Sequence, residues 1–326
     1  MLTRKPDEIA GLIRQSQRIA LCCHINPDGD TLGSALALRL GLMALSKQVD
    51  VFCQQGAPHL LRMLPGAETL RLPETAQGAY DLLIAIDISD TKRMGTCAGL
   101  MEHAAHTAQI DHHGTNTCFM QVNSVDPAAP ATALLIRQQL SALEVAITHA
   151  IAQCLYVGIS TDTGNFSYSS TSAETFRVMA ELMEAGLPLG EINRQLYCQR
   201  EKPQVQLLQR ALASMTFYED DRITLMTLMQ RDFAACGATA EHTDPITNYG
   251  LDIEGVKLSA FLRETPEGSV KVSLRSVGPA RVDQVAASFG GGGHPQAAGA
   301  TVDMPINEAR EKVLAALKRV LNEDNE

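Results

Sequence analysis

The sequence lacks any apolar run approaching the roughly 20 residues that a membrane-spanning helix needs. Its N-terminal segment, MLTRKPDEIAGLIRQSQ, mixes charges into an apolar stripe and lacks the uninterrupted apolar core of a signal peptide. An internal repeat and a low-complexity tract are missing as well. These absences argue against a membrane protein, and they lead us to expect a cytoplasmic one.

Paired cysteine motifs are also missing. The 8 cysteines are scattered, and none forms a CxxC pair. Cys22 and Cys23 are adjacent in a predicted strand, so their side chains should point to opposite faces of a sheet. We therefore expect reduced, mostly buried thiols rather than a zinc site or a disulfide framework.

Basic residues are fewer than acidic ones, 27 lysines and arginines against 37 aspartates and glutamates. The net charge is −10 and the isoelectric point lies near 5.4. This balance argues against a protein that grips long duplex nucleic acid by a basic surface. A small anionic substrate stays open, because bound metal ions can supply local positive charge.

Alternating strand and helix patterns fill the first half of the chain, and 326 residues suffice for two domains. Such alternation predicts an α/β fold with a parallel sheet and helices on both faces. The predicted strands are 18–24, 48–53, 81–87 and 106–110; the predicted helices are 31–46, 95–104, 130–144, 148–160 and 172–185.

The second half reads as a smaller α/β domain with a mixed sheet. We place the first domain at 1–186, a connecting segment at 187–205 and the second domain at 206–326. The predicted strands are 215–219, 222–228, 255–264 and 269–276, and the predicted helices are 281–289 and 306–322, interrupted by GGGGH at 290–294.

Acidic and histidine residues follow several of the predicted strands. His24, Asp28 and Asp30 follow the first, Asp87 ends the third, and 111–113 follows the fourth. Ligands bind at the C-terminal ends of parallel strands. Imidazole nitrogen mixed with carboxylate oxygen suits divalent cations such as manganese. For HINPDGD alone, a polar turn is an equal alternative to metal binding.

Other candidates are weaker when taken singly. Thr31 is a candidate cap for the helix that follows HINPDGD, whose N-terminus could also hold an anion. Asp87 could bridge two cations, or simply cap a loop. Asp162, in GISTDTGNF, is either a ligand or an ordinary helix-end residue. Arg93 is either a phosphate contact or a surface charge.

The tripeptide Asp111-His112-His113 is less ordinary. Adjacent histidines after a strand point in different directions, so one could bind metal while the other faces substrate. Asp111 could accept a ring N–H and so set the tautomer. A pair of plain surface histidines is the less favoured interpretation.

Four consecutive glycines, 290–293, mark the second domain. Successive N–H groups in such a loop can form an anion-binding nest, to which His294 would add a donor or a stacking ring. Arg275 could pair with phosphate through its planar fork. A flexible loop and an exposed strand-end charge are the alternatives.

Together these motifs resemble the DHH phosphoesterase superfamily. The resemblance rests on HINPDGD, AID, DHH and GISTDTG in that order, then on VKVSLRS with FGGGGHPQAAG, which is similar to the DHH-associated domain. It covers nearly the whole chain. Within the superfamily, the two-domain length and GGGGH are similar to NrnA-type nano-RNases that also hydrolyse 3'-phosphoadenosine 5'-phosphate (pAp).

The resemblance implies a role for each matching residue. His24 and Asp28 would hold one metal ion and Asp30, His112 and Asp162 another, with Asp87 bridging them. His113 would face the scissile phosphate, supported by Asp111. The implied substrate-binding residues of the second domain are Arg275, Ser276, Gly291, Gly292, Gly293 and His294.

The implied activity is hydrolysis of short oligoribonucleotides and pAp. Two cations about 3.5–4 Å apart, manganese or else magnesium or cobalt, would activate a bridging hydroxide that attacks phosphorus. A homodimer is compatible with the family. Alternatives are a cyclic dinucleotide phosphodiesterase and a non-catalytic nucleotide- or RNA-binding module. A RecJ-like exonuclease fits the short, acidic chain poorly, and a manganese pyrophosphatase would lack GGGGH.

Overall fold

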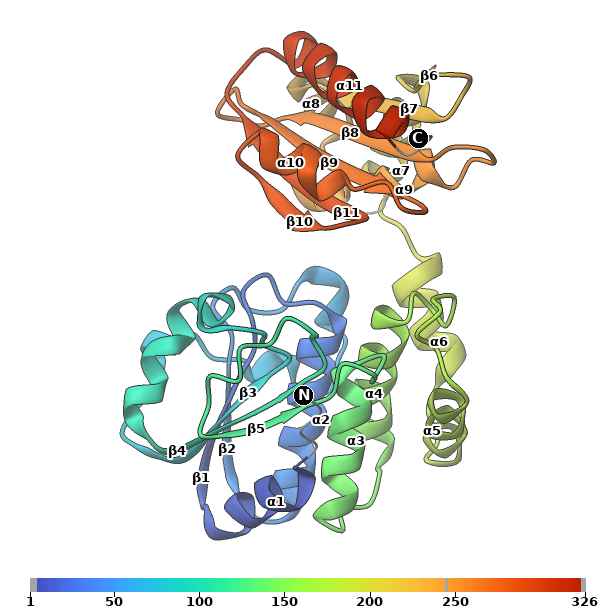
Figure 1. Cartoon of the computed structure of the whole chain (residues 1–326). Coiled ribbons are helices and arrows are strands. Elements are labelled where there is room, and N and C mark those ends of the chain that lie inside the picture. Colours follow the sequence, from blue (N-terminus) through green and yellow to red (C-terminus); the bar gives the residue numbers. More distant parts are fainter. Residues whose placement is uncertain (1–4, 244–245, 324–326) are drawn as a thin grey trace. The chain divides into compact units, whose positions relative to one another are not determined.

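The computed structural model describes residues 5–243 and 246–323, and the chain forms two compact units, residues 1–199 and 200–326 (Figure 1). Each unit has its own sheet. Within the described residues, no helix is both long and apolar enough to cross a membrane.

Unit 1 (residues 1–199) is built on a sheet of five parallel strands in the order β2-β1-β3-β4-β5, which confirms the predicted parallel sheet. Parallel strands buried on both faces are rich in apolar residues, and β1 and β3 are almost entirely buried. The strands are β1 Arg18–Cys22, β2 Gln48–Phe52, β3 Tyr80–Ile86, β4 Ala104–Asp111 and β5 Val122–Val125.

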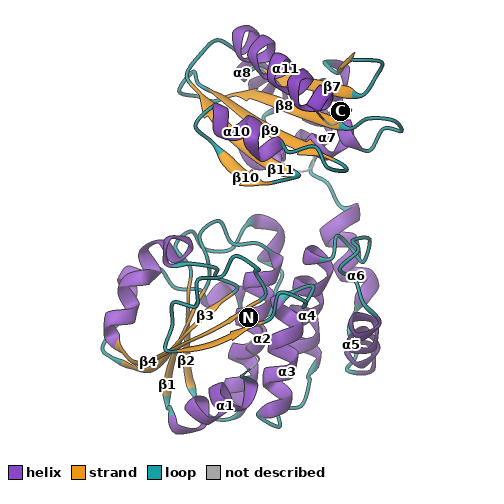
Figure 2. Cartoon of the chain, in the orientation of Figure 1, coloured by secondary structure: helices purple, strands orange, loops and turns teal. Residues whose placement is uncertain are grey.

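Helices cover both faces of this sheet (Figure 2). Cys23 is buried with the α-helices on one face, and Cys22 with η4 on the other, as their adjacent positions in sequence predict. The α-helices are α1 Pro6–Gln15, α2 Gly29–Ala44, α3 Thr132–Ala142, α4 His149–Asp162, α5 Ala173–Glu184 and α6 Leu189–Asn193; the other helices are η1 His59–Leu61, η2 Ala67–Thr69, η3 Pro73–Thr75, η4 Thr91–His103 and the π-helix η5 Arg194–Cys198.

Helix η4 differs from the α-helix expected at 95–104. It is a 3₁₀ segment that starts at Thr91 and is broken at Gly95, whose φ is +55°. The Asp90 side chain caps its first turn. A Cβ on Gly95 would lie 2.4 Å from a methyl carbon of Ile25, so the chain can pass this point only with glycine.

Helices α2 and α4 approach each other closely because glycines face the contact. A Cβ on Gly33 would lie 2.4 Å from the carbonyl oxygen of Cys154, and one on Gly29 would lie 2.4 Å from the hydroxyl of Thr161. Side chains at these positions would push the helices apart. The small residues therefore bring the start of α2, with Asp30, close to the end of α4, with Asp162.

Unit 2 (residues 200–326) contains a six-stranded mixed sheet in the order β10-β11-β9-β8-β7-β6, in which β7 and β8 are parallel and the other pairs antiparallel. The strands are β6 Thr216–Tyr218, β7 Ile223–Leu228, β8 Leu258–Glu264, β9 Val270–Ser276, β10 Gly292–His294 and β11 Ala297–Val302. One apolar cluster joins the sheet to α10 and α11, and another joins it to α7 and α8. The helices are α7 Lys202–Ala213, α8 Gln230–Cys236, η6 Ala240–Thr243, α9 Ile246–Leu251, α10 Val282–Ser288 and α11 Ile306–Glu323. The predicted second α/β domain with a mixed sheet is confirmed.

Strands β10 and β11 are absent from the sequence-based expectation, because the glycines suggested a loop. In the structure 292–294 pairs with 297–299. A Cβ on Gly291 would lie 2.1 Å from the carbonyl oxygen of Gly299, and one on Gly293 would lie 2.6 Å from that of Ala297. Close backbone packing therefore accounts for two of the four glycines without any ligand.

Candidate metal centre

The candidate ligands of unit 1 gather at the C-terminal edge of its sheet. His24 follows β1, Asp87 follows β3, and 112–113 follows β4. Asp30 lies in the first turn of α2 and Asp162 is the last residue of α4. Residues that lie far apart in sequence are thus brought together by the parallel topology.

One group of ligand atoms comprises His24, Asp28 and Asp87, and these atoms all lie within 4.8 Å of one another. Nε2 of His24 is 3.4 Å from a carboxylate oxygen of Asp28 and 3.5 Å from one of Asp87. These separations exceed those of good N–H···O hydrogen bonds. They leave room for a shared cation between the groups.

A second group comprises Asp30, His112 and Asp162, again within 4.8 Å. Nε2 of His112 lies 3.1 Å from Asp162 and 3.9 Å from Asp30. The membership of both groups matches the two ligand sets that the resemblance implies.

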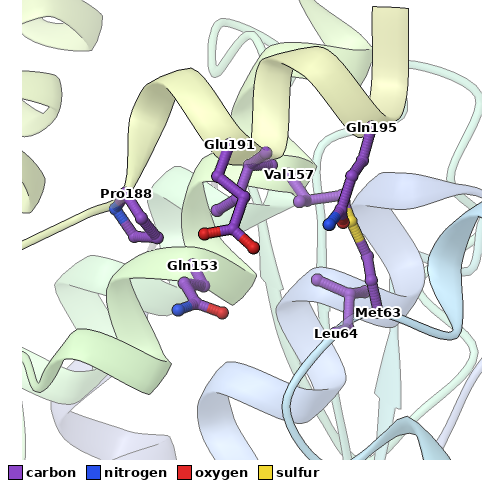
Figure 3. Close-up of a pocket in the computed structure, with 8 residues that line it drawn as sticks. Met63, Leu64, Gln153, Val157, Pro188, Glu191 and Gln195 are labelled. Atoms are coloured by element: carbon purple, nitrogen blue, oxygen red, sulfur yellow. The ribbon is translucent and has the colours of Figure 1, made fainter. Parts of the chain in front are cut away.

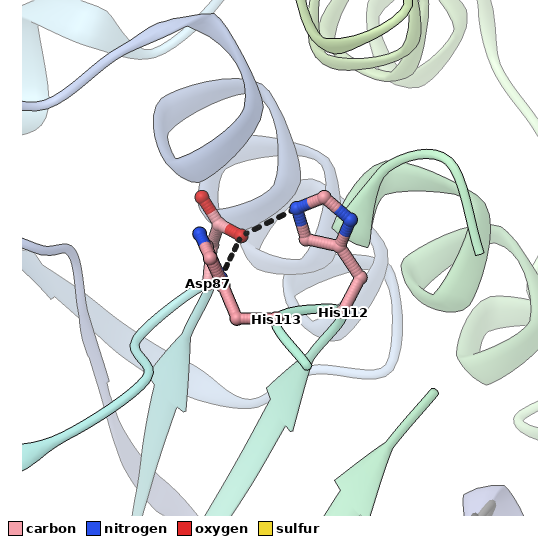
Figure 4. A group of neighbouring side chains, drawn as sticks. All are labelled: Asp87, His112 and His113. Carbon is pink, nitrogen blue, oxygen red and sulfur yellow. Dashed lines mark ion pairs between the residues drawn. The ribbon is translucent and has the colours of Figure 1, made fainter. Parts of the chain in front are cut away.

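Asp87 lies between the two groups. Its Oδ2 faces His24, whereas its Oδ1 is 3.6 Å from Nε2 of His112 and 3.6 Å from Nδ1 of His113 (Figure 4). The Thr132 hydroxyl donates to Oδ1 over 2.7 Å. The φ of Asp87 is +60°, an uncommon value for a residue other than glycine, and such backbone strain is concentrated at functional sites.

Hydrogen bonds set the orientation of the two candidate ligands His24 and His112. Nδ1 of His24 lies 2.8 Å from the Ile25 carbonyl oxygen, and Nδ1 of His112 lies 3.1 Å from that of Ala129. A carbonyl can only accept, so each Nδ1 carries the proton. In the neutral imidazole, each Nε2 then presents a lone pair to the carboxylates, as in a metal-ligating histidine.

A buried nitrogen without a hydrogen-bond partner indicates that these residues suit a cation. Nε2 of His24 is buried and has no hydrogen-bond partner among the described residues. A buried polar atom without a partner is costly unless something binds it. A divalent cation would replace any proton on Nε2 and use its lone pair together with the carboxylate oxygens beside it.

Electrostatics at the cluster point in the same direction. Burial opposes the charged form of His24, but the carboxylates of Asp28 and Asp87 outweigh it and raise its pKa to about 10. Burial, and then repulsion by Asp87 and Asp162, raises the pKa of Asp30 well above its usual range. Burial also raises the pKa of Asp162. Concentrated negative charge of this kind is relieved by a bound cation.

His113 is held by a separate carboxylate. Its Nδ1 lies 2.7 Å from Oδ1 of Asp111, a buried residue. Burial opposes the charged form of both groups, yet their mutual bond keeps the pKa of Asp111 low and that of His113 raised. Asn116 donates to the other carboxylate oxygen of Asp111 and to the Ile88 carbonyl.

The expected cap of α2 is wrong in one respect. Asp28 caps the helix, accepting from the backbone N–H groups of Asp30 and Thr31. The Thr31 hydroxyl instead donates to the Ile86 carbonyl, at the end of β3. Thr31 is already inside the helix, because the helix starts at Gly29 rather than after residue 31.

Several supporting residues are missing from the sequence-based set. The backbone N–H groups of Thr132 and Ala133 donate to the two carboxylate oxygens of Asp30 over 2.6 and 2.9 Å. The Ser34 hydroxyl also donates to Asp30. An aspartate from α2 thus caps the N-terminus of α3, where its charge is favoured by the helix dipole.

The candidate substrate residues of unit 2 lie around one sheet edge. Arg275 is half-buried near the end of β9, opposite Ala297 of β11, which in turn pairs with His294 of β10. His294 is exposed. Ser276 is buried; its N–H donates to the Gln296 carbonyl and its hydroxyl to that of Ala280.

A pocket of about 110 Å³ lies elsewhere in unit 1, between α4, α6 and the segment at Met63 and Leu64 (Figure 3). Its acidic lining residue is Glu191, and it contains none of the clustered histidines and aspartates. The metal candidates therefore occupy a different part of this unit.

Comparison with known proteins matches a part of each unit to a known family. Residues 18–159 match the model of the DHH family, N-terminal domain, and residues 233–323 match that of the DHHA1 domain. The bifunctional oligoribonuclease and PAP phosphatase NrnA of Thermus thermophilus is 34% identical over 93% of this chain and 90% of its own length. The protein of the same name from Bacillus subtilis is 25% identical over 97% of this chain and 98% of its own length.

The chain is also similar to a phosphodiesterase and to a protein of known structure. The cyclic-di-AMP phosphodiesterase PdeA of Listeria monocytogenes is 26% identical over 94% of this chain but only 48% of its own length. The crystal structure of an exopolyphosphatase-related protein from Bacteroides fragilis superimposes with a TM-score of 0.93 at 27% identity, covering 98% of this chain and 97% of that one.

Proposed function

Because this chain belongs to the DHH family, we propose that it is a metal-dependent phosphoesterase that hydrolyses short oligoribonucleotides and pAp. One observation carries the proposal. Asp87 directs one carboxylate oxygen to a histidine–aspartate group on one side and the other oxygen to a histidine group on the other. That arrangement suits a residue shared by two cations.

In this proposal His24, Asp28 and Asp87 hold one divalent cation, and Asp30, His112, Asp162 and Asp87 hold the other. Their mixture of imidazole nitrogen and carboxylate oxygen favours manganese, with magnesium or cobalt as alternatives. When bound, such a pair of cations supplies an activated water and neutralises charge on phosphoryl oxygens.

His113 and Asp111 supply the neighbouring proton donor. Because Nδ1 of His113 is held by Asp111, its Nε2 is left for the substrate. Burial opposes the charged form of His113, but its bond to Asp111 raises its pKa, which favours a protonated ring that donates to a phosphoryl oxygen. Asp111 stabilises this charge and fixes the ring, while Asp87 lies 3.6 Å from the same Nδ1.

Substrate binding is assigned to the second domain, which we place at 206–326 after the DHH domain at 1–186 and the connecting segment at 187–205. Arg275 would pair with a second phosphate, and His294 with a base or phosphate. Gly291, Gly292 and Gly293 keep this edge free of side chains. Ser276 would hold the turn after Arg275, because its N–H and its hydroxyl both donate hydrogen bonds to backbone carbonyls of unit 2.

Short RNA and free nucleotides, rather than long duplexes, suit a chain of net charge −10. We also propose that the protein is cytoplasmic, as its N-terminal sequence leads us to expect. A homodimer is the oligomeric state we propose, and sedimentation would test it.

A substrate panel tests the activity. Purified protein with added manganese is offered pAp, di- to pentaribonucleotides and cyclic di-AMP, and released phosphate and mononucleotides are quantified. We expect turnover of pAp and the short RNAs. Preference for cyclic di-AMP would favour the second candidate, a cyclic dinucleotide phosphodiesterase, which the similarity to PdeA supports. Binding without any product would contradict an enzyme.

A further inference from the structure

Arg93 lies next to the candidate metal centre, and its backbone is fixed there. Its carbonyl oxygen accepts the N–H of Ile25, the residue after His24, over 2.8 Å. Its own N–H donates to the side chain of Asp90, the cap of η4. The backbone of Arg93 is therefore tied to the loop that carries the first candidate ligands.

The guanidinium of Arg93, by contrast, has no hydrogen-bond or ion-pair partner among the described residues, although the side chain is half-buried. A partly desolvated charge without a partner is unfavourable unless an anion joins it. Its neighbour Lys92 is exposed, so water can solvate its charge without such a partner.

Arg39 is the useful comparison. It is also half-buried and also lacks a partner within the described residues. It lies nine residues after Asp30 in α2, however, which is about 13 Å along the helix axis. Arg39 is therefore an arginine of similar exposure that lies away from the candidate metal ligands.

The charges of the proposed site require an additional cation near the phosphate. The proposed ligands include the four carboxylates Asp28, Asp30, Asp87 and Asp162, whose charge two divalent cations only cancel. A phosphate ester then adds charge that protein cations must compensate. Arginine is suited to this, because its planar fork donates two hydrogen bonds to phosphate oxygens.

We propose that Arg93 is a further catalytic residue, whose guanidinium binds a non-bridging oxygen of the scissile phosphate. This rests on the proposed phosphoesterase function. The bond should strengthen as charge builds on the phosphoryl oxygens during attack, so Arg93 contributes to turnover as well as to binding.

The test uses the full-length protein with Arg93→Ala, Arg93→Gln and Arg93→Lys, and Arg39→Ala as the matched control. Binding of inorganic phosphate in the presence of manganese is measured by calorimetry, and kcat and KM are measured with pAp and a diribonucleotide. Manganese binding alone is titrated in parallel. Arg93→Gln keeps much of the side-chain volume, so it serves if Arg93→Ala does not fold.

We expect Arg93→Ala and Arg93→Gln to weaken phosphate binding at least tenfold and to lower kcat/KM by about 10²–10³, the usual effect of removing one charge-stabilising donor. Arg93→Lys should recover part of the loss. Manganese affinity should stay within about threefold of the wild type, and Arg39→Ala should stay near wild type throughout.

Phosphate binding by Arg93→Ala and Arg93→Gln within twofold of the wild type would overturn the proposal, as would an equal loss in Arg39→Ala. The phosphate titration needs no turnover. If the wild-type protein hydrolysed neither substrate, the proposed function would fail, and the role of Arg93 in phosphate binding would still be decided.

Discussion

Gly158 of α4 faces Asp30 of α2 so closely that a Cβ on the glycine would lie 2.8 Å from a carboxylate oxygen of the aspartate. The same Cβ would lie 2.7 Å from the side chain of Ala133. A glycine without any chemistry of its own thus lets a candidate ligand reach its partners in α3 and α4.

Gly158→Ala should therefore weaken metal binding and destabilise the fold. Overpacking of this kind costs about 1–3 kcal/mol, and a displaced Asp30 would misplace its oxygens. Urea unfolding and manganese titration measure the two effects. Gly11→Ala in α1 is the control: no atom lies within 4 Å of the added Cβ, and a helical alanine should stabilise by about 0.5–1 kcal/mol. A Gly158→Ala protein that binds manganese like the wild type would refute this role.

Asn116→Ala should lower kcat about 10- to 100-fold with little change in KM. The substitution removes the side-chain amide that holds Asp111, which in turn orients His113, and loss of such supporting hydrogen bonds typically costs this much. Asn123→Ala is a matched control, because within the described part of the chain the Asn123 side chain bonds to the backbone of Met120 alone. An equal loss in both variants would indicate a general structural effect instead.

Asp162→Asn should separate stability from metal binding. Burial and neighbouring carboxylates raise the pKa of Asp162, so a neutral side chain should leave the metal-free protein at least as stable. Wild-type protein should gain about 2.7 kcal/mol for each site held at 100 times its Kd. Thermal unfolding with manganese and with a chelator measures both. We expect the variant to lose the gain from the site that contains Asp162, about half of the manganese-dependent total, whereas the surface substitution Asp7→Asn should keep all of it.

Asp81 should make stability depend on pH. Its carboxylate accepts the N–H groups of Gln17 and Arg18, both over 2.7 Å, and these bonds hold its pKa below the ordinary value of 3.8. Because the pKa is lower in the folded state, the stabilisation is complete above the unfolded value and is lost as pH falls through the folded value. Asp81→Asn should destabilise the protein at pH 7 but much less near pH 3 in urea unfolding. A pH-independent difference would contradict this assignment.

Much of the sheet, and the gathering of the candidate ligands at its edge, can be predicted from sequence, because both depend on local patterns. The apolar run before Asp87 indicates a buried parallel strand, and the acidic and histidine residues stand where such strands end. Strand β5, the sequence VNSV, lacks this signal because two of its four residues are polar. The short strand β10 could not be predicted, because two of its three residues are glycines, which suggest a loop.

The supporting contacts could not be predicted, because they join residues remote in sequence. Asp30 accepts from Thr132, 102 residues away, and the hydroxyl of the same threonine reaches Asp87. Helix α3 gives no sign of this in its own sequence, since its cap residue Ala131 has no side-chain acceptor. Likewise Gly158 looks like an unfavourable residue within a helix until α2 is placed beside it.

The most direct measurement is anomalous diffraction from crystals of the full-length protein grown with manganese. The account predicts two manganese peaks in each chain, one beside His24 and Asp28 and the other beside His112 and Asp162, with Asp87 contacting both. Asp87→Ala crystals should lose at least one peak. A single ion, or two ions bound away from these residues, would contradict the account.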